Sequence, residues 1–198
     1  GVFAGADDSG TTPLHLAADA GCFPLVQILS SAPNTAELAA SENNDGVQAL
    51  GCAFHGAAVR GVSTENALKI AALLIEKGAP VKRAIVSGKT REPLLTHCIR
   101  QQMLPERSPP GQPCFPEVLY ASETPDVMML DVNGMSCLMA AATMRANRAY
   151  LNLIMQYAES AGKTAELILC RDNVGYTALM HAILEGNVSF ANELLHSA

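Results

Sequence analysis

The chain has 198 residues, of which 49% are hydrophobic, 16% are charged and only 5% are aromatic. This length suffices for one full hydrophobic core or a short row of stacked units, and the apolar content excludes an intrinsically disordered protein. The formal net charge is -6 and no basic cluster is longer than Lys82-Arg83, which argues against nucleic acid as a partner.

The first predicted element is a tight turn that leads into a short helix in residues 10–18, GTTPLHLAA. Gly10 permits a positive φ, Thr12 can cap the helix with its hydroxyl, and Pro13 fits the first helical position. With Asp7 in front, the segment resembles the ankyrin-repeat signature D-x-x-G-x-T-P-L-H-x-A-A. A repeat protein contains its pattern more than once, so the resemblance can be tested within this one chain.

Four further copies of the core follow along the chain, and each keeps the leucine. The five leucines are Leu14, Leu50, Leu94, Leu138 and Leu179. Their spacings of 36, 44, 44 and 41 residues exceed the roughly 33 that are typical of ankyrin repeats, which predicts insertions within most repeats.

A second apolar segment follows each core and predicts a partner helix. In residues 24–29, 65–75 and 149–155 the apolar side chains recur with the period of one helix face. The third copy departs most from the pattern, since Thr90 replaces the glycine and His97 takes a small-residue position. Its second helix is predicted at 116–122, after a proline-rich linker at 105–113. The linker is interpreted as an insertion loop, the alternative being a proline-rich ligand for another domain.

The resemblance implies an all-α fold, an ankyrin-repeat solenoid of stacked helix-turn-helix units with hairpin loops. The predicted repeats span residues 7–34, 43–81, 87–122, 131–158 and 172–198 of one domain, which we expect to be part of a longer chain. If the stack ends with the last repeat, its final helix should be polar outside. Phe190, Leu194 and Leu195 are then expected to face inward, and Asn187, Asn192, Glu193 and His196 to face water.

Motifs for catalysis or cofactor binding are incomplete. Two Gly-Lys-Thr tripeptides, at 88–90 and 162–164, lack the earlier glycine of a phosphate-binding loop, because those positions hold Arg83 and Tyr157. Two groups of cysteine and histidine were considered as sites, Cys52 with His55 and His97 with Cys98 and Cys114. Neither group provides the two close ligand pairs of structural zinc, and neither has a third residue to orient a catalytic cysteine. We therefore predict no catalytic residue, metal or cofactor, and no enzyme activity.

The six cysteines form no framework of paired spacings, which favours reduced thiols in the cytoplasm or nucleus. No apolar stretch approaches the length of a membrane span, so we predict no membrane contact. We expect the domain to be monomeric alone.

By resemblance, the hairpin tips and the first helices form a concave recognition surface, and a histidine at position 15 orders the stack by bonding the neighbouring loop. The exposed family positions map onto Thr11, Asp19, Val47, His55, Arg91, Met135, Met144, Tyr176 and Glu185. Among them Arg91, Met135 and Tyr176 take the same hairpin position and are expected to form a row. The resemblance therefore implies a non-catalytic scaffold or adaptor that binds a protein partner, and the acidic net charge favours a partner with a basic surface. The alternative is a regulatory or substrate-recruiting domain of a larger enzyme.

Overall fold

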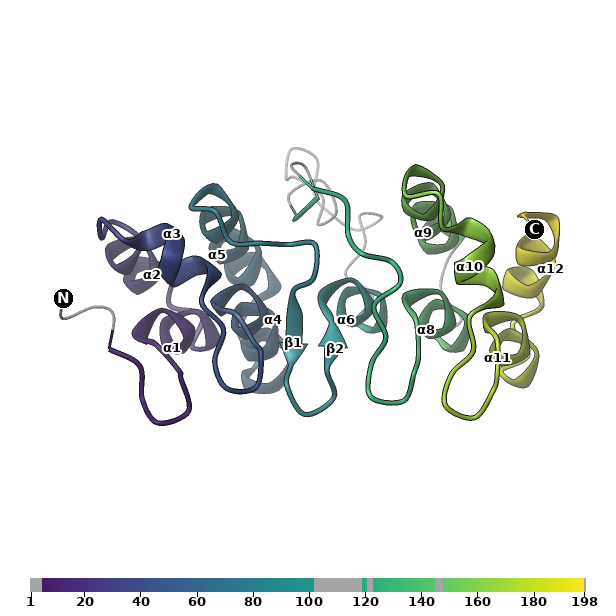
Figure 1. The fold of residues 1–198 in the computed structure, drawn as a ribbon, viewed down its shortest axis with the longest axis horizontal. Helices are drawn as coiled ribbons and strands as arrows, with labels where there is room; N and C mark the ends of the chain where they lie inside the picture. The colour runs from purple at the N-terminus through teal and green to yellow at the C-terminus, as the bar shows by residue number, and fades with distance from the viewer. Residues whose placement is uncertain (1–4, 102–118, 121–122, 145–147, 198) are drawn as a thin grey trace. The chain divides into compact units, whose positions relative to one another are not determined.

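The computed structural model describes residues 5–101, 119–120, 123–144 and 148–197. The chain forms two compact units, one of residues 1–94 with 108–124 and the other of residues 95–107 with 125–198. In each unit the hairpin loops lie beside the first helices, on the side away from the second helices (Figure 1). The proline-rich linker and most of the helix predicted at 116–122 lie outside the described residues.

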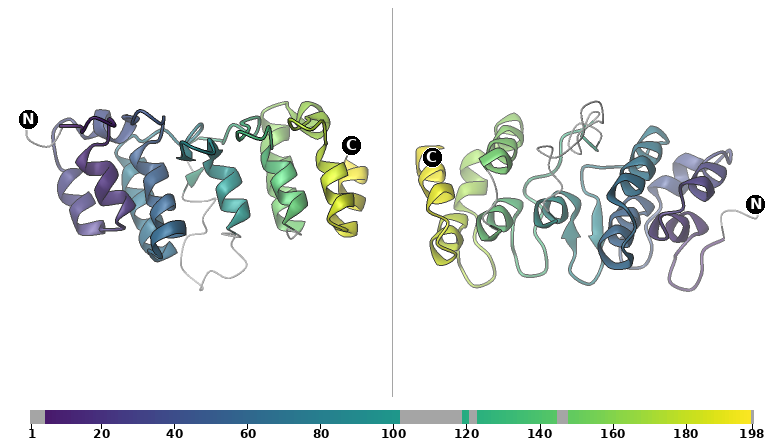
Figure 2. Two further views of the ribbon diagram at one scale, coloured as in Figure 1. Left: turned by 90° about the horizontal axis from the view of Figure 1, so that it is seen from below. Right: turned by 180° about the vertical axis from the view of Figure 1, so that it is seen from behind.

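Among the described residues, the first unit contains two helix pairs, one further short helix and a short β-hairpin. Its elements are α1 (Pro13–Asp19), α2 (Phe23–Leu29), α3 (Thr35–Ala40), α4 (Ala49–Arg60), α5 (Thr64–Glu76), β1 (Ile85–Ser87) and β2 (Glu92–Pro93). Helix α1 packs on α4, and each of these first helices packs on its own second helix, α2 or α5. Figure 2 shows the two pairs standing side by side.

Small residues in α4 allow its close approach to the elements on either side. A Cβ atom on Gly56 would lie 2.0 Å from the carbonyl oxygen of Asp19 at the end of α1, and one on Gly51 would lie 1.9 Å from that of Ile85 in β1. Ala53 and Phe54 of the same helix are fully buried. The abundance of alanine and glycine in the cores therefore reflects narrow gaps between neighbouring elements.

The third predicted hairpin is the one that forms β structure. Strands β1 and β2 pair antiparallel, with Ile85 opposite Pro93 and an irregularity between Ile85 and Ser87. Thr90 stands where the other hairpins have glycine, and here the left-handed backbone conformation falls one residue later, on Arg91 with φ 47°. Among the described residues, the fold is all-α apart from this hairpin and one isolated bridge, between Glu42 and Gln48.

In the described part of the second unit, α6, α8 and α11 are the first helices of their repeats, and α9, α10 and α12 are the helices that follow them. Its elements are α6 (Leu94–Arg100), which begins at the last residue of the first unit, α8 (Cys137–Thr143), α9 (Arg148–Ser160), α10 (Thr164–Leu169), α11 (Ala178–Leu184) and α12 (Val188–Ser197). Helix α8 packs on α9 and α11, and α11 packs on α12. Ser136 and Thr177 cap α8 and α11, because their hydroxyl oxygens accept the N–H groups of Met139 and Met180. Leu138, Met139, Leu151 and Ile154 are at the centre of the core.

Two side chains of the last helix pair are not where the sequence placed them. Leu195 was expected to face inward but is exposed, whereas Phe190 and Leu194 are buried as predicted. Asn187 was expected to face water but is buried, because its Nδ2 donates a hydrogen bond to the carbonyl oxygen of Ala142 at 3.2 Å. Within the described residues, no helix is both long and apolar enough to cross a bilayer.

Candidate partner-binding surface

Four hairpins share a turn that is closed by the side chain of their first residue. In each, the Oδ1 atom of an aspartate or asparagine accepts the backbone N–H groups two and four residues later, at 2.8 to 3.0 Å. The residues are Asp7, Asn43, Asp131 and Asp172. The fourth residue of each turn is a glycine with φ between 74° and 94°. The backbone of each tip is thus fixed before any partner arrives.

Consecutive hairpins within a unit are joined by one asparagine. Asn44 donates its backbone N–H and its Nδ2 to the carbonyl oxygens of residues 9 and 8, both at 2.9 Å. Asn173 repeats this arrangement on residues 133 and 132, at 3.0 and 2.9 Å. The sequence analysis included the aspartate of the signature but assigned it no role in the turn, and it did not select these asparagines, although the spacing of an aspartate or asparagine three residues before glycine recurs along the chain.

His15 links α1 to the next hairpin, as the resemblance implied. Its Nδ1 accepts the N–H of Thr12 at 3.3 Å and lies 2.7 Å from the Thr12 hydroxyl, and its Nε2 donates to the carbonyl oxygen of Val47 at 3.1 Å. Burial lowers the pKa of His15, although its backbone hydrogen bonds oppose this shift. The ring is therefore neutral at physiological pH and serves the stack as a structural bridge.

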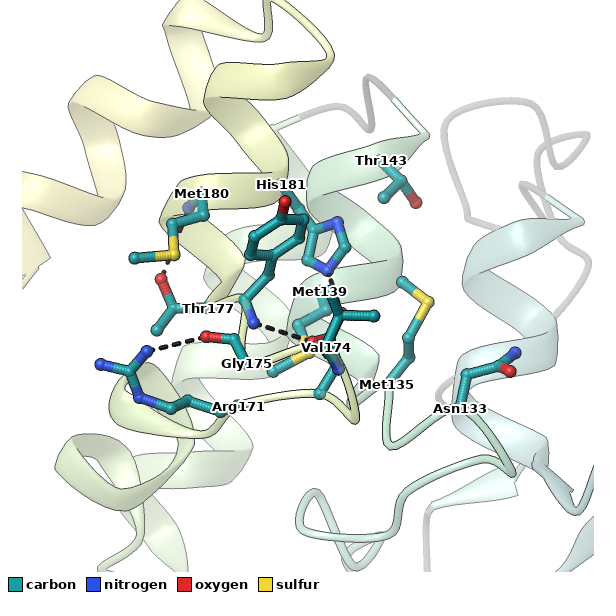
Figure 3. A network of polar contacts seen from close by, with 12 residues as sticks. Asn133, Met135, Met139, Thr143, Arg171, Val174, Gly175, Thr177, Met180 and His181 are labelled. Carbon is teal, nitrogen blue, oxygen red and sulfur yellow. Dashed lines mark hydrogen bonds and ion pairs between the residues drawn. The ribbon is translucent and has the colours of Figure 1, made fainter.

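The last hairpin has a second polar contact that holds its tip against α11 (Figure 3). His181 Nε2 lies 2.8 Å from Asp172 Oδ2, and the His181 ring meets the Tyr176 ring edge to face with centroids 5.8 Å apart. Burial raises the pKa of Asp172, but hydrogen bonds from the Tyr176 N–H, His181 and the Val174 N–H outweigh it, so the net shift is downward. Asp172 is thus ionised at neutral pH and fixes both the turn and the histidine.

The structure brings two of the predicted contact residues together in the first unit. Asp19, at the end of α1, lies 2.9 Å from His55 Nδ1 and 2.8 Å from an Arg60 guanidinium nitrogen, both on α4. The carboxylate is largely shielded while His55 and Arg60 are partly exposed. This cluster makes the α1–α4 side of the first unit polar and positions two nitrogen-bearing side chains at its surface.

In the second unit Met135 and Tyr176 occupy equivalent hairpin positions. The N–H of each is bonded to the first residue of its own turn. Tyr176 is 40% exposed, whereas Met135 is half-buried with its Sδ 3.8 Å from an Arg100 nitrogen that also pairs with Asp131 at 2.9 Å. Arg91 is exposed on the first unit, and its place in one row with these two stays a prediction.

The remaining predicted contact residues differ in exposure. Glu185 is exposed, Met144 is half-buried, and Thr11 is half-buried with its hydroxyl 2.7 Å from that of Ser9. Val47 does not suit a contact role, because its side chain is only 5% exposed. The hairpin tips also present two valines that the sequence analysis did not select, Val132 and Val174, the latter 74% exposed.

Nothing in the described residues assembles nucleophilic or metal-binding chemistry. Burial raises the pKa of the Cys52 and Cys137 thiols to about 12, so both are protonated and unreactive at neutral pH. The described part of the chain contains no group of three or more histidine, cysteine, aspartate or glutamate side chains arranged to hold a metal ion. Cys114 lies outside that part.

Comparisons with known proteins agree with this architecture. The family model for the ankyrin repeat matches residues 9–43. The predatory endopeptidase Bd0816 from Bdellovibrio bacteriovorus in complex with immunity protein Bd3460 contains a chain with TM-score 0.67 and 22% identity, covering 99% of this chain and 86% of that one. An ankyrin repeat domain from Acinetobacter baumannii AYE has TM-score 0.66 and 18% identity, covering 100% and 86%. No curated protein matches the sequence.

Proposed function

We propose that the chain, which has the fold of ankyrin repeat domains and matches the ankyrin-repeat family model at residues 9–43, is a non-catalytic scaffold or adaptor that binds a protein partner through its hairpin tips and first helices. The observation that carries the proposal is the combination of a fixed tip backbone with exposed apolar side chains. Asp172 holds the last turn closed, while Val174 and Tyr176 on that turn are exposed. Such a surface loses little conformational entropy on binding.

The chemistry of the tips defines the partner further. Val132, Val174 and Tyr176 offer apolar and aromatic contact area, the kind that is enriched at the centre of protein interfaces. The net charge of -6 favours a partner that carries a basic surface around an apolar contact. The thiols of Cys22, Cys52, Cys137 and Cys170 are free, which favours a reducing compartment, the cytoplasm or nucleus.

A second role uses the same surface, that of a regulatory or substrate-recruiting domain in a larger enzyme. It is supported by the structural neighbour from a complex of an endopeptidase with an immunity protein, a setting in which an enzyme and a binding protein meet. The two roles differ in the captured protein, since a domain of a larger enzyme would capture a substrate or a regulator of the attached catalytic domain.

The test is affinity capture from a cell extract with three forms of the protein as bait. The tip variant carries Val174→Ser and Tyr176→Ala, which leave the Asp172 turn bonds to the backbone intact. The control variant carries Leu169→Ser, which removes an equally exposed apolar side chain from α10. We expect a partner that the wild type and the control capture alike and that the tip variant captures at least about tenfold less.

Equal capture by all three folded forms would contradict the placement of the contact on the last hairpin. Circular dichroism of each form establishes that the tip variant is folded. Expression of the longer chain that contains this domain, followed by a test of whether it chemically modifies the captured partner, then separates the adaptor role from the enzyme-associated one.

A further inference from the structure

The third hairpin concentrates positive charge in an acidic chain. Residues 77–91 contain five of the 13 lysines and arginines and none of the 19 aspartates and glutamates. Lys82 and Arg83 precede β1, and Lys89 and Arg91 lie in the turn between β1 and β2. All four are exposed. Figure 1 shows this turn on the same side of the first unit as the loops before α1 and α4, so the basic tip belongs to the hairpin side of that unit.

Three of these charges have no partner in the described part of the protein. The side chains of Lys82, Lys89 and Arg91 form no ion pair or hydrogen bond with any residue that the structure describes. Lys69 and Lys163, in contrast, each form an ion pair with a glutamate three or four residues away. A bound anion can therefore pair with the hairpin without first breaking contacts within the described protein.

The charge of the tips changes sign between the second and the third hairpin. Counting from Leu50 and Leu94, Lys89 takes the position of Asp45 in the preceding hairpin. The two tips are in contact, since a Cβ atom on Gly88 would lie 2.2 Å from the Cβ of Asp45. The Asp45 carboxylate thus borders the basic surface on one side. An anionic ligand is therefore directed onto the side chains of the third hairpin itself.

Arg91 has its charged side chain at a backbone position that favours glycine. Its φ is 47°, and in the described part of the chain it is the only residue other than glycine with a positive φ. A Cβ atom in this left-handed region is destabilising. Residues in such conformations are concentrated at binding sites and other functional sites. An exposed arginine where glycine would be more stable is a second indication that this tip binds a ligand.

The spacing of the charges favours an extended ligand. Lys82 and Lys89 are at opposite ends of β1, and the chain between them spans at most about 25 Å. An extended peptide covers this length with about seven residues or more. Residues 77–91 contain no aromatic side chain on which a nucleic-acid base could stack. The charges therefore suit carboxylates that are spread along a peptide better than a nucleic acid.

We propose that the third hairpin is a binding site for an extended acidic segment of a protein, whose carboxylates pair with Lys82, Lys89 and Arg91. The acidic remainder of the chain repels such a segment from other surfaces. The site lies within the first unit and shares no residue with the tip surface proposed for the second. Exposed ion pairs each contribute little, so binding is weak and depends on salt.

The experiment measures the fluorescence anisotropy of a labelled peptide of about ten alternating glutamate and glycine residues. The whole chain is added up to about 300 μM in about 50 mM salt. Lys82→Gln combined with Lys89→Gln should weaken binding about three- to tenfold. The matched control, Lys69→Gln combined with Lys163→Gln, makes the same change in net charge away from the hairpin and should weaken it less than about twofold. Circular dichroism establishes that both forms are folded.

Arg91→Gly separates loss of binding from loss of folding. It removes the charge and places glycine in the left-handed conformation. Binding of the peptide should therefore weaken about two- to fivefold, while the midpoint of urea unfolding stays the same or rises. In NMR spectra of the wild type, the peptide should shift the amide signals of residues 82–92, and about 300 mM salt should reverse these shifts.

Three outcomes would overturn the proposal. The first is an unchanged anisotropy with the wild type over the whole concentration range. The second is an equal loss of affinity in the hairpin variant and in its matched control, which would mean that the basic side chains of the hairpin are not the site. The third is tighter binding of a single-stranded DNA of the same charge, which would identify nucleic acid as the ligand in place of an acidic protein segment.

Discussion

Replacement of Gly134 by alanine tests how the hairpins of the second unit are held together. Gly134 has a φ of 75°, where a residue with a Cβ loses about 1 to 2 kcal/mol. The new Cβ would lie 2.6 Å from Oδ1 and 2.9 Å from the backbone nitrogen of Asn173. Asn173 must then move, which weakens its two hydrogen bonds to residues 133 and 132, each worth about 0.5 to 1.5 kcal/mol. We expect Gly134→Ala to lower the free energy of unfolding of this unit by about 2 to 5 kcal/mol.

Gly175→Ala is the matched control, because Gly175 also has a positive φ, of 94°, but nothing lies within 4 Å of its Cβ position. It should lose only the backbone contribution of about 1 to 2 kcal/mol. Urea unfolding followed by circular dichroism gives both values, and hydrogen exchange of the Asn173 amide reports on the hairpin contact directly. Equal losses for the two variants, with unchanged exchange at Asn173, would refute the reasoning that Asn173 joins the hairpins.

Three further predictions follow from individual contacts. The pKa of His15 is lower in the folded state than its unfolded value of about 6.5, so the stability that its neutral ring contributes is present above that pH and is lost as the pH falls below it. Between about pH 7.5 and about pH 5, the free energy of unfolding in urea should therefore fall more for the wild type than for His15→Gln. An identical fall for the two proteins would contradict this. Asp172→Asn keeps an Oδ1 acceptor like the one that Asn43 uses in its own turn, so it should lower the free energy of unfolding by less than about 1 kcal/mol. Asp172→Ala should lower it by about 1 to 3 kcal/mol in the same assay. The reverse order would exclude the turn hydrogen bonds as the main contribution of Asp172 to stability. Cys137, buried and with a pKa of about 12, should be modified by a maleimide only after unfolding, while half-exposed Cys170 is modified in the native protein, as peptide mass spectrometry can show.

The sequence predicted the helix-turn-helix units because the signals for them are local. Gly10 and its counterparts supply the left-handed turn residue, Pro13 and the threonine before it begin the first helix, and a leucine at a fixed distance begins each apolar stripe. The resemblance to the ankyrin signature also predicted that His15 bonds the backbone of the neighbouring loop, and the contact of its Nε2 with the carbonyl oxygen of Val47 confirms this. The third hairpin shows the limit of such signals, since without its glycine the left-handed residue moved to Arg91.

Only the tertiary structure decided which side chains are covered, because that depends on neighbours some 36 to 41 residues away along the chain. Val47 is buried beneath the His15 bridge although its place in the motif predicted exposure. Leu195 fits the inward stripe of α12, yet its side chain is 61% exposed in the structure. Local spacing fixes the units, and stacking determines which of their faces are left to bind a partner.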